Sequence, residues 1–114
     1  MIVLRLPFPP SANSLFAGKR RRYVSPQYKR WRVNAGWEIR LQKVQPIAGP
    51  VTIDIALTPP DNRRRDCDNA NKPILDLLVA NGLLADDSRE IVRQVTARWT
   101  DADQPQAVVT ITPA

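Results

Sequence analysis

The sequence predicts a single α/β domain over residues 1–114, a small mixed β-sheet with two helices in the order β-α-β-α-β-β. Two observations favour this class. Several short segments alternate apolar with polar residues, which is typical of half-buried strands, and two longer segments carry apolar residues at helical spacing. The chain has 114 residues, which fits one domain, and 43% of them are hydrophobic, a globular value.

Four segments are predicted to be strands. The clearest is 51–58, where Val51, Ile53, Ile55 and Leu57 alternate with smaller or polar residues. The polar stretch 100–106 contains Pro105 and separates the last two strands, so we expect these two to form an antiparallel hairpin. The four predicted strands cover residues 2–6, 51–58, 91–99 and 107–112.

Ser25 and Pro26 predict the start of the first helix, because serine is a good N-cap and proline is favoured in the first turn. This helix is expected to reach about Val44, and a second helix is expected over residues 69–81. The first helix has two apolar stripes on opposite faces. One stripe suffices to cover a sheet, so the second needs another partner, and we expect a homodimer. The stripes consist of Tyr28, Trp31, Ala35 and Ile39 on one face and of Val33, Trp37, Leu41 and Val44 on the other.

The charge balance favours a polyanionic partner. The chain has 17 basic and 11 acidic residues, a net charge of +6, and 13 of the basic residues are arginine. Arginine binds phosphate oxygens two at a time, so DNA or RNA is the expected ligand. We predict that two basic clusters contact it, one in an exposed loop and one directly before a pair of aspartates. They are Lys19, Arg20, Arg21 and Arg22, and Arg63, Arg64 and Arg65.

Residue types that are missing exclude several chemistries. The sequence has no histidine, which excludes Ser-His-Asp triads, Cys-His nucleophiles and His-ligated zinc. Its one cysteine, Cys67, excludes an intrachain disulfide and a Cys-rich zinc site. No apolar stretch is long enough to span a bilayer, and no secretory signal is recognisable, so we expect a cytoplasmic protein without membrane contact.

The predicted chemistry centres on Asp66 and Asp68. In extended backbone both carboxylates point to one side and Cys67 points to the other. Two such carboxylates repel unless they are protonated or bridged by a cation, and their oxygens suit Mg²⁺, with Mn²⁺ as a substitute. Asp86 and Asp87 follow the second helix, and we expect the loop to return them to the same end of the sheet.

Two further pairs qualify this interpretation. Lys72 lies on the first turn of the second helix, and Asp76 is four residues further, so the two side chains are expected to pair. Asp101 and Asp103 repeat the spacing of Asp66 and Asp68 inside a polar turn, and we assign them no function. They serve as an internal control.

In this order, the motifs resemble the signature of RusA-type Holliday junction resolvases, the crossover junction endodeoxyribonucleases of bacteria and prophages. The segment 7–13 also resembles the proline-rich N-terminal segment of that family, so the resemblance covers nearly the whole chain. It implies a Mg²⁺-dependent homodimer, encoded by a bacterium or a phage, that cuts four-way DNA junctions. The motifs are Arg65-Asp66-Cys67-Asp68-Asn69, Lys72-Pro73, Asp76 and Asp86-Asp87.

The resemblance also implies roles for individual residues. By position, Asp66, Asp68 and Asp87 match the metal-binding catalytic carboxylates of the family, and Lys72 matches its catalytic lysine. Supporting positions are matched by Asp86, which we count among the metal ligands, and by Asn69 and Arg65. Pro73 removes one backbone donor near the start of the second helix.

Three alternatives remain open from the sequence. The chain could cut other branched DNA, such as flaps or replication forks. It could be a non-catalytic basic module whose acidic cluster is structural. It could also be an interaction protein that uses the second apolar stripe of its first helix.

Overall fold

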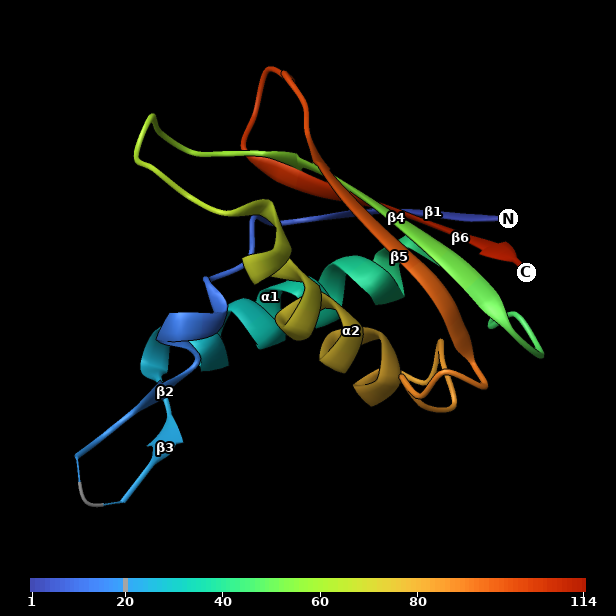
Figure 1. Ribbon diagram of the computed structural model, residues 1–114, viewed down its shortest axis with the longest axis horizontal. Coiled ribbons are helices and arrows are strands. Elements are labelled where there is room, and N and C mark those ends of the chain that lie inside the picture. The colour runs from blue at the N-terminus through green and yellow to red at the C-terminus, as the bar shows by residue number, and fades with distance from the viewer. Residues whose placement is uncertain (20) are drawn as a thin grey trace.

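A four-stranded sheet with both helices on one face forms the two layers of the computed structural model (Figure 1). The structure describes residues 1–19 and 21–114. The elements of these two layers are β1 (Ile2–Leu6), α1 (Pro26–Gln42), β4 (Val51–Thr58), α2 (Asn71–Ala80), β5 (Val92–Trp99) and β6 (Gln106–Pro113). The predicted α/β class and the order of its main elements are therefore confirmed.

The strand order in the sheet is β1-β6-β4-β5. Strand β6 is antiparallel to both of its neighbours, whereas β4 and β5 are parallel, so the sheet is mixed as predicted. The predicted hairpin between the last two strands is wrong, because β4 lies between β5 and β6. Every second side chain of β6 is buried, which suits an interior position, whereas β5 is half-exposed along its length. Charged residues such as Arg93 and Arg98 are typical of an edge strand.

The core lies between the inner face of the sheet and the two helices. Leu4, Ile55 and Val109 are fully buried on three neighbouring strands, and Ile74 and Leu78 are fully buried on α2. Because each strand alternates between the two faces, only one face of the sheet is apolar enough to bury helices. The edge strand β5 remains half-exposed beside these layers.

Helix α1 begins as predicted. The hydroxyl oxygen of Ser25 accepts a hydrogen bond from the backbone N–H of Tyr28 at 3.1 Å, and Pro26 follows it in the first turn. The helix ends at Gln42, two residues before the predicted end, because Lys43 adopts a left-handed conformation with φ of 51°. Burial decides which stripe covers the sheet: the stripe of Tyr28 and Trp31 lies in the core.

The second stripe of α1 faces solvent in this structure. Val33, Trp37 and Leu41 are 60%, 57% and 69% exposed. Val44 lies just after the helix and is half-buried against the core. The exposed stripe thus consists of Val33, Trp37 and Leu41.

Sequence patterns did not predict a small hairpin and two 3-10 turns. Strands β2 (Phe16–Ala17) and β3 (Tyr23–Val24) form a hairpin that projects from the two layers (Figure 1). Gly18 has a φ of +100°, and a Cβ there would lie 2.2 Å from the carbonyl oxygen of Arg21, so this turn requires glycine. The turns are η1 (Ala12–Ser14) and η2 (Cys67–Ala70).

Over the ranges 1–19 and 21–114, no helix has the length and apolar character that crossing a membrane requires.

Candidate active site

Asp66 and Asp68 lie where the chain enters α2. Asp66 has extended backbone angles, with φ of −102° and ψ of 131°, and η2 starts directly after it. The expectation of extended backbone through Asp68 is therefore wrong, because this aspartate lies in a 3-10 turn. The predicted division of side chains is nevertheless observed: both aspartates are exposed, and Cys67 packs inward with its Sγ donating to the Ala97 carbonyl at 3.6 Å.

Neither carboxylate is used by the rest of the described chain. The Asp66 side chain caps no backbone N–H at the start of η2. No ion pair within residues 1–19 and 21–114 involves Asp66 or Asp68. Two neighbouring exposed carboxylates without cationic partners offer oxygen ligands of the kind that Mg²⁺ prefers. The chemistry of these donors fits the implied metal.

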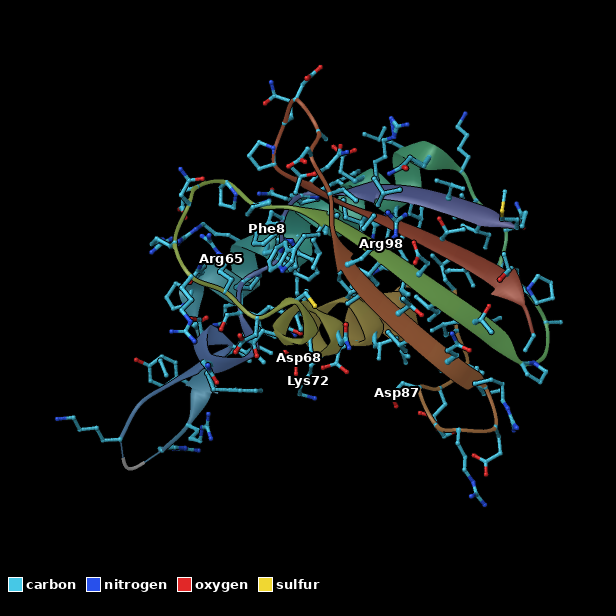
Figure 2. The ribbon with its side chains drawn as sticks, turned by 45° about the horizontal axis from the view of Figure 1, so that its top comes forward. Phe8, Arg65, Asp68, Lys72, Asp87 and Arg98 are labelled. Atoms are coloured by element: carbon cyan, nitrogen blue, oxygen red, sulfur yellow. The ribbon has the colours of Figure 1, made fainter. Side chains whose placement is uncertain are left out.

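Lys72 and Asp76 form the predicted pair one helical turn apart. The Lys72 Nζ lies 3.2 Å from an Asp76 carboxylate oxygen, and both side chains are partly exposed. In the view of Figure 2, Asp68 and Lys72 are both drawn near the start of α2. The ammonium group is therefore held by a carboxylate of the same helix.

Asp86 and Asp87 occupy the exposed loop between α2 and β5. The buried side chains of Leu83 and Leu84 anchor this loop, and the backbone N–H of Asp87 donates to Asp86 at 2.8 Å. In Figure 2, Asp87 lies apart from Asp68 and Lys72. Within the described part of the chain, no three acidic or cysteine side chains are grouped closely enough to hold a metal. A site shared by Asp66, Asp68 and Asp87 thus stays a prediction.

The arginine cluster before Asp66 is organised by Asp61, which the sequence analysis did not single out. Arg65 donates to both Asp61 oxygens, at 2.7 and 3.1 Å, and Arg63 Nε approaches the same carboxylate at 3.1 Å. The hydrogen bond from Arg65, followed by the backbone N–H of Arg63, holds the pKa of Asp61 well below its usual range. The Asp61 carboxylate in turn raises the pKa of Arg65. An aspartate two and four residues before arginines is a local signal that could have predicted this pairing.

The three arginines differ in what they can still bind. The Arg65 side chain is only 18% exposed, whereas that of Arg63 is 78% exposed. Arg64 is exposed, and no acidic partner for it lies in the described ranges. Arg63 and Arg64 therefore remain accessible to phosphate, while Arg65 is held within the protein.

Beside this cluster lies a cleft of about 870 Å³ lined by aromatic residues. Phe8, Trp31 and Trp99 come from three different segments, and Asp66 and Asn69 line the same cleft. Figure 2 shows Arg65 beside Phe8, and the guanidinium carbon lies 5.6 Å from the centre of the ring. The sequence carried no signal for this cleft, because only the tertiary fold brings the end of β5 next to the segment after β1.

The described residues of the other basic cluster, Lys19, Arg21 and Arg22, lie between β2 and β3. Lys19, Arg21 and Arg22 are exposed, as predicted, and Arg22 stacks over Phe16 at 5.3 Å. Arg20 lies outside the described residues. The control aspartates Asp101 and Asp103 are exposed in the loop between β5 and β6.

Comparison with known proteins decides the family. The sequence model of the family described as Endodeoxyribonuclease RusA matches residues 7–112. The chain belongs to the RusA family. The resemblance predicted from its motifs is confirmed, and with it the prediction of a nuclease.

Relatives of the RusA family in bacteria and a phage are similar over most of this chain. The crossover junction endodeoxyribonuclease RusA of Escherichia coli (strain K12) is 36% identical over 90 residues, which cover 77% of this chain and 75% of that protein. The RusA protein of Enterobacteria phage 82 is 34% identical over 90 residues, which cover 77% of this chain and 75% of that protein. That of Aquifex aeolicus (strain VF5) is 31% identical over 85 residues, which cover 74% of this chain and 68% of the relative.

The RusA family match includes the whole candidate site. Asp61, the arginine cluster, Asp66, Lys72 and Asp87 all lie between residues 7 and 112. The aromatic residues of the cleft lie in the same range.

Proposed function

We propose that this member of the RusA family is a Mg²⁺-dependent endodeoxyribonuclease that resolves four-way DNA junctions by paired, symmetric phosphodiester hydrolysis. One observation carries the proposal: the exposed carboxylates of Asp66 and Asp68, which form no ion pair within residues 1–19 and 21–114, directly follow an arginine cluster in a chain related to crossover junction endodeoxyribonucleases. Carboxylates would repel DNA unless a cation joins them to its phosphates. Arginines beside them supply the attraction that brings the phosphate there.

The proposed metal ligands are Asp66, Asp68 and Asp87, with Asp86 as a further oxygen donor. Carboxylate oxygens suit Mg²⁺, and Mn²⁺ would be accepted by the same ligands. When bound, the ion supplies Lewis-acid chemistry at the scissile phosphate. Asp86 and Asp87 are exposed in the loop between α2 and β5, so the proposed site requires this loop to rearrange and bring them toward Asp68.

Other side chains bind and orient the DNA. Arg63 and Arg64 are accessible and would bind phosphate oxygens on either side of the scissile bond. The Lys72 ammonium would neutralise negative charge as it develops on the phosphate during hydrolysis. Asp76 holds the Lys72 side chain at 3.2 Å and so positions it for this role.

A homodimer is part of the proposal. A four-way junction must be cut in two strands, and a two-fold dimer places two identical sites symmetrically. The exposed stripe of Val33, Trp37 and Leu41 supports this assembly, because the opposite stripe of α1 is already buried within the fold. We propose that the exposed stripe packs against its counterpart in the second subunit.

The decisive experiment is a cleavage assay on a synthetic mobile four-way junction with and without Mg²⁺. We expect paired symmetric nicks that require the metal. Asp68→Asn keeps the size of the side chain but removes one charge, so cleavage should fall by orders of magnitude while junction binding persists. Asp101→Asn is the matched control and should cut at the wild-type rate. Loss of cleavage in Asp101→Asn alone would show that the site is assigned to the wrong aspartates.

A substrate panel separates junctions from other branched DNA. Flaps and replication forks are offered beside the four-way junction at equal concentration. Preferential paired cutting of the junction supports resolution. Faster cutting of flaps or forks would show that those structures, and not four-way junctions, are the preferred substrates.

A further inference from the structure

Two aromatic rings, those of Phe8 and Trp99, line the cleft beside Asp66, and we call this pair the aromatic platform. Phe8 and Trp99 stack with ring centres 6.4 Å apart and planes inclined by 17°. Trp99 is 42% exposed although it lies on the face of the sheet that elsewhere buries apolar residues. An exposed tryptophan lining a cleft is a surface that can stack a further planar group.

The platform is held in place before any ligand arrives. Trp31, which lines the same cleft, donates its Nε1–H to the Pro7 carbonyl at 2.9 Å. The Arg65 guanidinium lies over Phe8 and is clamped by Asp61 through two hydrogen bonds. These contacts fix the segment that carries Phe8. A rigid platform loses little conformational entropy on binding.

The charges around the cleft indicate what the planar group is attached to. Arg63, Arg64 and Asp66 line the same cavity as Phe8 and Trp99. A nucleotide whose phosphate lies at these arginines therefore has its base within reach of the aromatic rings. Polar side chains on the walls offer hydrogen-bond donors and acceptors to the edge of a base. They are Ser11, Asn13, Gln27 and Asn69.

We infer that the cleft binds one unstacked nucleobase of the DNA strand beside the scissile phosphate, stacked on the platform of Trp99 and Phe8. This inference rests on the proposed function, because a base at a branch point is easier to unstack than a base inside a regular duplex. Base stacking would then contribute to the preference for branched DNA. The polar walls would make the cleft sensitive to which base enters.

The test is a thermodynamic cycle between protein and DNA, measured by binding without Mg²⁺. The DNA is a four-way junction in which an abasic site replaces each nucleotide flanking the branch in turn. The protein is wild type or Trp99→Leu. We expect Trp99→Leu to bind the intact junction about tenfold more weakly, the size of one lost base stack. At one abasic position the wild type should bind about tenfold more weakly than it binds the intact junction. Trp99→Leu should bind this abasic junction and the intact junction with equal affinity.

Controls separate stacking from a structural role. Trp99→Phe retains an aromatic ring and should restore most of the affinity, whereas Val3→Ala removes an exposed apolar group from β1 and should change nothing. Affinity for linear duplex should be the same for Trp99→Leu and wild type. If Trp99→Leu does not fold, Phe8→Leu enters the same cycle.

Each outcome bears on the inference. The inference is supported if, at one abasic position, the protein variant and the abasic site together weaken binding no more than either change alone. It is overturned if the two losses of affinity add at every position, or if neither change weakens binding. Because the cycle uses binding alone, it can fail while the wild type still cuts junctions with Mg²⁺. Conversely, a wild type that never cuts would refute the proposed function and leave the result of the cycle standing.

Discussion

The Asp61 carboxylate accepts two hydrogen bonds from the Arg65 guanidinium, 2.7 Å from Nη1 and 3.1 Å from Nη2. This geometry presents the planar fork of arginine to both carboxylate oxygens. The same guanidinium lies over the Phe8 ring. Arg65 therefore links the loop after β4 to the segment after β1, and its charge is already matched by an internal partner.

The first prediction concerns the titration of Asp61. Its pKa is lowered by Arg65, so the stabilisation from this pair is present above the ordinary value of 3.8 and is lost as the pH falls through the depressed value. An NMR titration of the Asp61 carboxyl carbon should give a midpoint below 3.8. In Arg65→Gln the midpoint should rise toward that value. A wild-type midpoint at the ordinary value would mean that the pair does not form in solution.

The second prediction concerns the salt dependence of DNA binding. If about six phosphates are neutralised, the logarithm of the binding constant should fall with a slope of about −5 against the logarithm of the salt concentration. Arg64→Gln should make this slope less steep by about 0.9, which is the contribution of one phosphate contact.

Arg65→Gln is the matched comparison for Arg64→Gln. Its slope should stay close to that of the wild type, because the Arg65 charge faces Asp61 rather than DNA. Fluorescence anisotropy over a series of salt concentrations measures both. Equal reductions in the two variants would contradict the division of roles within the cluster.

The four long strands and the two α-helices could be predicted from the sequence because each depends on local periodicity, which the short hairpin of β2 and β3 lacks. The N-cap at Ser25 and the alternation in β4 are examples. The strand order could not be predicted in this way, because strands that follow one another in the sequence, such as β5 and β6, need not be neighbours in the sheet. Which strand lies beside β4 depends on how the whole sheet buries its apolar face. The arginines of β5, Arg93 and Arg98, are a sequence feature that is consistent with an edge strand.

The candidate site divides in the same way. Asp66, Asp68 and the pair of Lys72 with Asp76 follow from spacing along the chain, and the structure places them as exposed or paired groups accordingly. The cleft formed by Phe8 and Trp99 joins residues that are 91 positions apart, and no local pattern encodes such a contact. Whether Asp87 joins the other aspartates depends on a loop conformation, which spacing does not determine either.

The third prediction concerns assembly. Leu41→Glu places a charge in the exposed stripe of α1, so the proposed dimer should dissociate into monomers at micromolar concentration. Light scattering after size-exclusion chromatography gives the mass. Val3→Glu, on the exposed side of β1, serves as the control and should leave the dimer intact. A monomeric mass for the wild type in this measurement would contradict the proposed dimer.

The fourth prediction separates Lys72 from the aspartate that holds it. Lys72→Met removes the ammonium but keeps an unbranched side chain, so the transition state loses charge stabilisation and the cleavage rate should fall about 10²–10³-fold. Junction affinity should change little, because a single charge contributes only one part of the electrostatic attraction. Rates under single-turnover conditions, with saturating Mg²⁺, report the chemical step.

Asp76→Asn tests the positioning role of the partner. The ammonium remains, but its hold at 3.2 Å weakens, so the rate should fall much less than in Lys72→Met. In the double variant, Asp76→Asn should add nothing to the loss caused by Lys72→Met, because the carboxylate acts through the lysine. A rate for Lys72→Met equal to that of the wild type would show that this lysine does not act on the phosphate, and the pair would then be only a helix-surface ion pair.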